Sequence, residues 1–399
     1  MTAKSLNLFA LRKQAHTCQG VHVPVLLERT RQKNGSKRIQ QLKRNVDENR
    51  SDYFAAFELV QALWEEGDRE NAVRACRKLV KNHDLPKAIL EPAAIFLFER
   101  RSLREARECF ARLGASEPDK ALPQCFLGRI HDLEGNPADA CRAHEKSIQL
   151  EPSNAECYYR YGVTLARNER RGEAEEYYRT AISLDQAHSK AYTNLGYLID
   201  LKGRCTEAMQ LFRKAVQCNP HSAEAHFNLG ALYGDSGNHE RAIREFRMAV
   251  RLDPESVEAH FNLGLALYEI GELDEALATF KTVIKLDGSH RFARYYVGMV
   301  LYRKGVYGKA LKVLQHVLKD DPDNPAVLYP IGVCYNRMDE PFKAIPPLKR
   351  VTELSPDDGR AYYFLGVVFD KTGMLDEAKK NYRTADSLFH KSGTQSAAL

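Results

Sequence analysis

The sequence repeats itself at an interval of 34 residues, and this period limits the fold more than any other feature. The segment AEAHFNLG at 223–230 returns as VEAHFNLG at 257–264. Alanine recurs at one place in the interval, as Ala72, Ala106, Ala140, Ala174, Ala208, Ala242, Ala276, Ala310, Ala344 and Ala378. Glycine recurs at another place, as Gly128, Gly162, Gly196, Gly230, Gly264, Gly298, Gly332 and Gly366. A fixed period of this length indicates stacked copies of one small unit that bury a shared core.

Each interval has the pattern of two helices joined by a turn. We number its residues from 1 to 34, with the first interval starting at residue 53. Apolar residues at positions 7, 11, 24 and 28 keep helical spacing and predict a continuous core. Glycine at position 8 lets a neighbouring helix approach closely, at a cost of about 1 kcal/mol in helix propensity. Glycine at position 15 favours the end of the first helix, and proline at position 32 favours the end of the second.

This interval resembles the tetratricopeptide repeat, which is a hairpin of two helices. In the copy at 223–256 the matching residues are Leu229, Gly230, Tyr233, Ala242, Phe246, Ala249 and Pro254. The pattern covers residues 53–392 as ten repeats without insertions. The resemblance implies an all-α, right-handed superhelical solenoid of ten 34-residue helix-turn-helix repeats. It also implies that the first helices of the repeats line a concave groove.

Residues 1–52 precede the repeats and are basic, whereas residues 393–399 form a short tail. The leading segment holds eleven Lys and Arg against four Asp and Glu, which is +7, whereas the whole chain is +6. Ile39, Leu42 and Val46 keep helical spacing behind Ser36, so the segment could end in a capping helix. The alternatives are a contact with an acidic partner or a membrane surface, and, for residues 1–27, a targeting segment, since no acid precedes Glu28.

The sequence carries no pattern of catalytic or cofactor-binding residues. It has no glycine-rich phosphate loop, no HExxH and no GxSxG, so we predict that the protein is not an enzyme and holds no cofactor. His131 and His144 occupy core positions, and Cys141 lies three residues before His144. A metal site is the alternative there, but we predict hydrogen-bonded histidines and no metal.

Cysteine usage and charge pattern bear on location and partner class. The nine cysteines are odd in number and form no CxxC, which favours free thiols in a reducing compartment, and we predict a cytoplasmic protein. No apolar run approaches the length of a membrane span. The basic leading segment lacks interleaved aromatic residues, so we predict no nucleic-acid partner.

Three rows of residues along the first helices are candidates for a peptide-binding site. Position 6 gives Asn194, Asn228 and Asn262, whose carboxamides could bond both polar groups of a peptide backbone. Position 5 gives Phe227, Phe261, Tyr295, Tyr329 and Tyr363. Position 13 turns basic at Arg303, Arg337 and Lys371, which would favour acidic ligands. The alternatives are ordinary repeat composition for the asparagines, packing between helices for the aromatics and solvated helix ends for the charges.

The asparagine row resembles the repeat region of O-GlcNAc transferases through the NLG triplets at 194–196, 228–230 and 262–264, although no transferase domain follows. We predict a scaffold or adaptor that holds an extended segment of another protein in its concave groove. The alternatives are a substrate-selecting subunit of a separately encoded enzyme, such as a transferase, and a self-assembling scaffold. Tyr382, Leu388 and Phe389 have no following repeat to cover them, so a homo-oligomer through this end is a further prediction.

Overall fold

The computed structural model describes residues 28–49 and 51–392, with side chains between residues 37 and 390. Every regular element in these ranges is an α-helix, and none is a strand. The predicted all-α repeat fold is confirmed. The chain divides into two compact bodies, which we call the N-terminal body (Met1–Cys218) and the C-terminal body (Asn219–Leu399).

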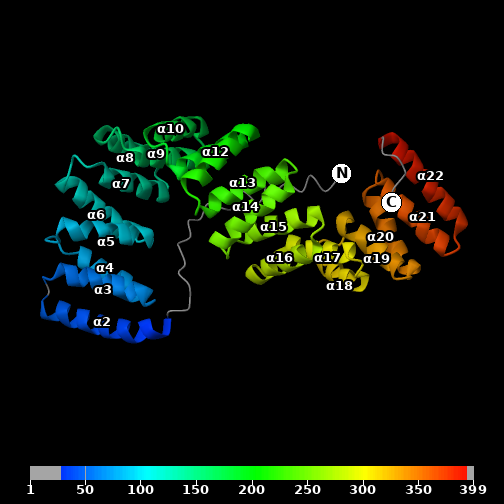
Figure 1. The fold of residues 1–399 in the computed structure, drawn as a ribbon, viewed down its shortest axis with the longest axis horizontal. Coiled ribbons are helices and arrows are strands. Elements are labelled where there is room, and N and C mark those ends of the chain that lie inside the picture. The colour runs from blue at the N-terminus through cyan, green and yellow to red at the C-terminus, as the bar shows by residue number, and fades with distance from the viewer. Residues whose placement is uncertain (1–27, 50, 393–399) are drawn as a thin grey trace. The chain divides into compact units, whose positions relative to one another are not determined.

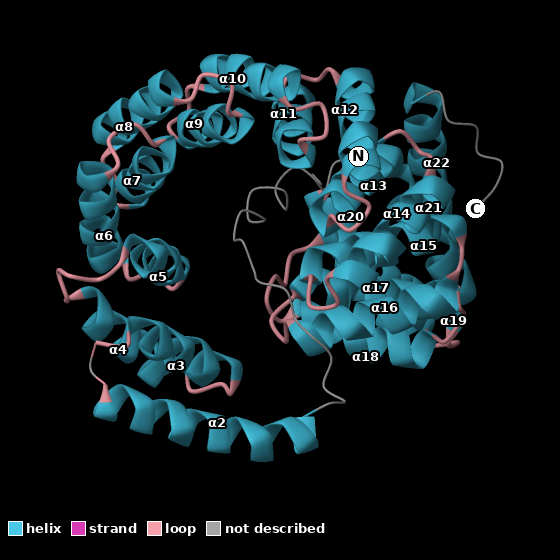
Figure 2. Ribbon diagram, turned by 60° about the vertical axis from the view of Figure 1, so that its left-hand side comes forward, coloured by secondary structure: helices cyan, strands magenta, loops and turns pink. Residues whose placement is uncertain are grey.

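The described part of the N-terminal body starts with one long helix, α2 (Glu28–Glu48), which is followed by five hairpins. The hairpins are α3 (Tyr53–Glu65) with α4 (Arg69–Val80), α5 (Lys87–Glu99) with α6 (Leu103–Ser116), α7 (Ala121–Leu133) with α8 (Pro137–Leu150), α9 (Ala155–Arg167) with α10 (Arg171–Leu184), and α11 (Ser189–Leu201) with α12 (Cys205–Cys218). Figure 2 shows that α5, α7 and α9 lie on the inner side of an arc, and that α6, α8 and α10 lie on its outer side.

The C-terminal body consists of five further hairpins in the same order along the chain (Figure 1). They are α13 (Ala223–Asp235) with α14 (His239–Leu252), α15 (Val257–Ile270) with α16 (Leu273–Leu286), α17 (Arg291–Arg303) with α18 (Tyr307–Leu318), α19 (Pro325–Arg337) with α20 (Pro341–Leu354), and α21 (Gly359–Lys371) with α22 (Leu375–Ser392). Each hairpin packs against the next, and the first helices α13 and α15, α17 and α19, and α19 and α21 contact one another.

The recurring glycine at position 8 makes room for a large side chain from the second helix of the same hairpin. A Cβ atom built at Gly264 would lie 2.7 Å from the ring of Phe280, closer than two such atoms can approach. The same relation joins Gly196 to Phe212 and Gly298 to Leu314. In the first repeat, Val60 stands in place of the glycine, and the facing second-helix position holds the smaller Cys76; both are buried. A glycine and a large side chain therefore interlock inside each hairpin from the third to the tenth.

All ten turns between the two helices of a hairpin use a residue in the left-handed conformation at position 15. Seven of these residues are glycines, with φ between +74° and +86°. The other three are Arg101, Glu169 and Asp339, with φ of 59°, 61° and 60°. The turn geometry is thus the same where the glycine is absent. In these three turns the Cβ atom makes the left-handed conformation sterically unfavourable.

Prolines within helices do not interrupt the stack. Pro92 lies inside α5, and Pro346 and Pro347 lie inside α20, yet each of these segments is one continuous helix. Leu348 and Val351, which follow the proline pair, remain buried.

The helix α2 packs against the first repeat. Leu42 is 7% exposed and belongs to the buried cluster that also holds Phe57 and Val60. Ile39 and Val46 lie against the same cluster. Residues 1–27, which contain the proposed targeting segment, and the tail 393–399 lie outside the described residues.

Candidate functional site

The three asparagines at position 6 occupy three different environments. In the N-terminal body, half-buried Asn194 lies with its Nδ2 atom 3.5 Å from the hydroxyl of Tyr159 and 3.4 Å from that of Tyr178. In the C-terminal body, Asn228 is half-buried. Asn262 is only 4% exposed, and its Nδ2 donates a 2.9 Å hydrogen bond to the carbonyl oxygen of Glu258. Asn262 therefore does not offer its side chain to a ligand, and the asparagines are not three equivalent rungs.

The aromatic row at position 5 packs mainly within the hairpins. The ring centroids of Phe227 and Phe246 lie 5.9 Å apart, and those of Tyr363 and Tyr382 lie 5.7 Å apart. Phe261 is 3% exposed, and its ring lies against the next repeat, 5.9 Å from Tyr296. This burial argues against direct ligand contact by Phe261. Tyr295, Tyr329 and Tyr363 remain half-buried, with part of each ring accessible.

A cluster of tyrosines joins the first helices α15 and α17. Tyr296 stacks on Phe280 at 5.3 Å and meets Tyr268 edge to face at 5.6 Å. Burial, with a smaller contribution from Tyr268, raises the pKa of Tyr296 to about 12. Tyr268 and Tyr302 are half-buried as well, and burial raises the pKa of both phenols. The sequence analysis did not include Tyr296 among the candidate residues, because it occupies position 6, where the preceding repeats have asparagine. An aromatic residue at that position could have pointed to it.

Two of the three basic residues at position 13, Arg303 and Lys371, reach back to the preceding repeat. The Nη1 atom of Arg303 donates a 2.6 Å hydrogen bond to the carbonyl oxygen of Tyr268, and the guanidinium lies 4.5 Å from the centre of that ring. Lys371 donates from Nζ to the carbonyl oxygen of Asn336 at 3.3 Å. Cations at the carboxyl end of a helix interact favourably with its dipole. Arg303, Arg337 and Lys371 are nevertheless exposed, so each keeps surface for a ligand.

The two histidines in the third repeat behave as structural residues. His144 is buried, and its Nε2 atom lies 3.1 Å from the hydroxyl of Thr164. His131 has its Nδ1 atom 3.8 Å from a carboxylate oxygen of Glu134. Among the residues with described side chains, no group of three or more His, Cys, Asp or Glu is placed to hold a metal ion.

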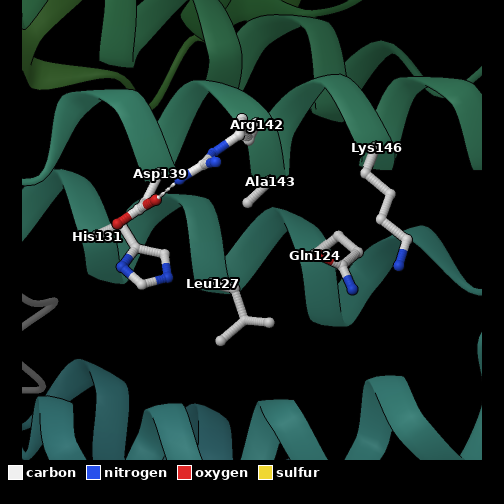
Figure 3. A pocket seen from close by; sticks show the side chains of 7 residues that line it. All are labelled: Gln124, Leu127, His131, Asp139, Arg142, Ala143 and Lys146. Carbon is white, nitrogen blue, oxygen red and sulfur yellow. Dashed lines mark hydrogen bonds and ion pairs between the residues drawn. The ribbon is translucent and has the colours of Figure 1, made fainter.

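An open hollow of about 420 Å³ lies over α7 and α8 in the N-terminal body. Its lining is Gln124, Leu127, His131, Asp139, Arg142, Ala143 and Lys146 (Figure 3). Arg142 is already paired with Asp139 on the same helix. None of the predicted binding residues lies here.

The last hairpin covers part of the surface that was expected to be bare. A Cβ atom at Gly359 would lie 3.0 Å from the ring of Phe389 and 3.3 Å from Cβ of Leu388, so both side chains pack on α21. Tyr382 is half-buried and faces Gly366. The more exposed apolar residues of this hairpin are Met374 and Leu375, at 39% and 57%.

Stacked two-helix repeats with an extended face of first helices define a class of protein-interaction scaffold. Family models described as tetratricopeptide repeat match residues 227–291 and 271–325, and again 155–188 and 359–389, and a model described as TPR repeat matches 201–237. The chain belongs to the tetratricopeptide repeat family. The likeness to the O-GlcNAc transferase repeats stays a prediction. No curated protein matches the sequence.

Several solved structures are similar to parts of this chain. YrrB, described as a TPR protein with an unusual peptide-binding site, is 28% identical, with 47% of this chain and 97% of that chain covered and a TM-score of 0.45. PilF of Pseudomonas aeruginosa is 18% identical, with 57% and 97% covered and a TM-score of 0.46. MamA of Desulfovibrio magneticus RS-1 is 24% identical, with 42% and 96% covered and a TM-score of 0.41. Separately, none of the described helices is long and apolar enough to span a membrane.

Proposed function

We propose that the protein is a non-enzymatic adaptor that holds an extended segment of another protein against the first helices of its C-terminal body. These helices are α13, α15, α17, α19 and α21. The observation that carries the proposal is a band of half-buried rings along α15, α17, α19 and α21. The band consists of Tyr268, Phe292, Tyr295, Tyr296, Tyr302, Tyr329, Tyr363 and Phe364.

Half-buried tyrosines suit recognition because one part of the ring is held by packing while the rest stays accessible. Tyr295, for example, meets Tyr296 edge to face at 5.2 Å. A ring fixed in this way loses little conformational entropy when a ligand covers it. Tyrosine and arginine are also the residue types that supply much of the binding energy at interfaces. Arg303 stands directly beside the band, over Tyr268.

The spacing of the repeats favours an extended ligand. Packed helices lie about 8–10 Å apart, so five successive first helices span roughly 40 Å. An extended chain advances about 3.3 Å per residue, and roughly 12 residues would cover that length. Half-buried Asn228 would bond the backbone of such a segment, whereas Asn262 and Phe261 are left out because they are buried. Asn194 belongs to the N-terminal body and is not part of this site.

We also propose a compartment and further partners for the protein. The eight cysteines in the described residues are free thiols, which supports a reducing compartment such as the cytoplasm. The basic N-terminal arm, 1–52, would meet an acidic partner or a membrane surface, and only 28–49 and 51–52 of it are described. Two alternatives remain: the protein could assemble with itself through the last hairpin, or it could be the substrate-selecting subunit of an enzyme. Identification of the bound partner would distinguish them.

The test is selection of binders from a library of random 16-residue peptides, with the full chain as bait. We expect enriched peptides whose affinity falls at least about tenfold in Met299→Glu, because Met299 is half-buried among the rings of α17. The matched control is Gln315→Glu on α18, an exposed site on a second helix, which should leave binding unchanged. A library that yields no binders, or binders indifferent to Met299→Glu, would overturn the proposal.

A further inference from the structure

Four positions of each first helix share one stripe of its surface. Positions 2 and 13 are eleven residues apart, which is close to three turns at 3.6 residues per turn, and positions 6 and 9 fall between them on the same side. We call these four positions the ligand stripe. In α15 it consists of Glu258, Asn262, Leu265 and Glu269. Its ends are more accessible than its middle, because Glu269 is exposed and Glu258 half-buried whereas Asn262 is buried.

The charge of the ligand stripe reverses along the C-terminal body. The stripe of α13 carries Glu224 and Asp235, and that of α15 carries Glu258 and Glu269. The stripes of α17 and α19 carry Arg303 and Arg337, and that of α21 carries Arg360 and Lys371. The reversal holds for the whole helices: α13 and α15 contain no Lys or Arg, and α17 and α19 contain no Asp or Glu. In α21 the one acid is Asp370.

Two of the basic stripe residues, Arg303 and Lys371, keep their charge in the hydrogen bonds they make within the protein. Arg303 and Lys371 bond to backbone carbonyls, which orient the cations without neutralising them. Arg360 pairs with Asp358, which weakens the positive charge at one end of α21 and leaves that of Lys371. All of the charged stripe residues except Glu258 are exposed.

The second helices of the same body show no such reversal. Helix α16 balances Asp274 and Glu275 with Lys281 and Lys285, and α18 carries only Lys309 and Lys312. Each of the second helices, α14 through α22, holds at least as many basic as acidic residues. The separation of charge is therefore confined to the helices that form the proposed ligand face.

Between the acidic and basic parts lies the apolar middle of the face. The stripe of α17 holds Phe292, Tyr296 and Met299, all half-buried, and α15 contributes Leu265. The face thus has three parts in order: acidic over α13 and α15, aromatic around α17, and basic from α17 to α21. First helices two steps apart, such as α15 and α19, lie roughly 16–20 Å from one another. This exceeds the Debye length of about 8 Å at physiological salt, so the two ends act separately on a ligand.

Resting on the proposed function, we propose that the bound segment is bipolar, with a basic cluster at one end, an apolar middle, and an acidic cluster at the other end. It binds in one orientation, with the basic cluster over α13 and α15 and the acidic cluster over α19 and α21. The opposite orientation would set like charges against each other at both ends. Such repulsion selects against wrong partners and wrong registers more strongly than it adds affinity.

The peptides selected from the random 16-residue library test this composition. We expect single peptides that hold Lys or Arg and Asp or Glu in separate clusters, about six or more residues apart by the helix spacing. A benzophenone placed beside the acidic cluster should crosslink to α19 or α21, and one beside the basic cluster to α13 or α15. Enriched peptides of one charge sign, or crosslinks at the opposite ends, would overturn the bipolar proposal while leaving peptide binding intact. A library without binders would instead remove the proposed function.

A variant that exchanges two exposed charges of the ligand stripe gives a second test of the bipolar ligand. Glu269→Arg with Arg337→Glu changes neither the net charge nor a residue of the buried core. We expect it to weaken a selected peptide about tenfold or more at 50 mM salt, and by less at 500 mM. The matched control, Lys309→Glu with Glu275→Lys, exchanges charges on the second helices and should leave affinity unchanged. Circular dichroism checks folding, and equal losses in both variants would contradict the assignment.

Discussion

His144 and Thr164 form a buried polar pair across the boundary between the third and fourth repeats, with His144 Nε2 and Thr164 Oγ1 3.1 Å apart. The imidazole fills the space above Gly128 that other hairpins fill with a phenyl, phenol or leucine side chain. It also stacks on Tyr161 at 5.6 Å between ring centres. A titratable ring thus occupies a core position.

The pair predicts a specific loss of stability in mild acid. Burial, followed by the charges of Arg129 and Arg160, lowers the pKa of His144 from 6.5 to about 3. Since the unfolded chain takes up the proton below pH 6.5 and the folded chain does not, this residue's contribution is present above pH 6.5 and falls toward pH 3. Between pH 7.5 and 5.5 the loss is about 1.4 kcal/mol.

Comparison of the wild type with His144→Phe isolates this effect. Urea unfolding at both pH values should show a smaller decrease of the unfolding free energy in the variant. His226, whose pKa is raised chiefly by its hydrogen bond with Glu245, titrates in both proteins and cancels. Equal pH dependence of the two proteins would show that the pKa of His144 is not lowered by folding.

The interlock between Gly264 and Phe280 predicts a steric penalty. Gly264→Val should lower the unfolding free energy by about 1–3 kcal/mol, because the added atoms overlap the ring. Adding Phe280→Cys should recover part of it, since the buried pair Val60 and Cys76 shows that the two sizes can be exchanged. The control is Gly172→Ala, where nothing lies within 4 Å of the new Cβ. Denaturant titration is the measurement, and a harmless Gly264→Val would refute the interlock.

Helix α2 is predicted to be part of the folded stack. Leu42→Ala should destabilise the first repeat by about 2–4 kcal/mol, because Leu42 is buried against that repeat. Trp64, the one tryptophan of the chain, lies on the same cluster, so its fluorescence reports the local transition. Lys43→Ala, at an exposed neighbouring position, should change the urea midpoint little. Identical transitions for all three proteins would place α2 outside the cooperative unit.

Burial of Asn262 separates its role from that of Asn228. The Oδ1 atom of Asn262 is buried without a hydrogen-bond partner. Since an unmet buried acceptor costs roughly 1–3 kcal/mol, Asn262→Leu should be neutral or stabilising and should not alter peptide affinity. Asn228→Ala should weaken selected peptides by roughly two- to tenfold, as expected for loss of one hydrogen bond. Calorimetry measures the peptide affinity of both variants. Similar losses of affinity would show that the asparagine row acts as one binding feature.

The last hairpin offers a test of self-association. If copies join through this end, Leu375→Glu should shift the protein toward monomer without lowering its melting temperature, since Leu375 is largely exposed. Leu388→Glu with Phe389→Glu should favour monomer and also lower the melting temperature, because both side chains pack on Gly359. Light scattering after size exclusion measures the mass. A wild-type monomer at high concentration would exclude this interface.

The repeat architecture could be predicted because its determinants are local and recur in each copy. The glycine at position 8 and the large residue sixteen places later belong to one hairpin, so their contact follows from a single interval. The turns were also predictable, and the left-handed backbone at Arg101, Glu169 and Asp339 shows that the hairpin imposes this geometry even on residues that disfavour it.

The accessibility of the site residues could not be predicted, because it depends on the neighbouring repeat. Phe261 is enclosed by Phe280 of its own hairpin and by Tyr296 and His290 of the following sequence. The equivalent Phe227 lacks such neighbours in the next repeat, where position 6 is Asn262, and stays half-buried. Identical motifs at 227–230 and 261–264 therefore differ in exposure for reasons that lie outside the motif.

Because Gly264 and Phe280 meet inside one hairpin, each 34-residue copy brings both halves of its own central contact. Duplication or loss of a whole copy in the gene would leave every remaining glycine opposite its large partner. A chain built in this way changes length in steps without redesign of its interior. Its ligand face, in contrast, diversifies one helix at a time, as the different charges on α15 and α17 illustrate.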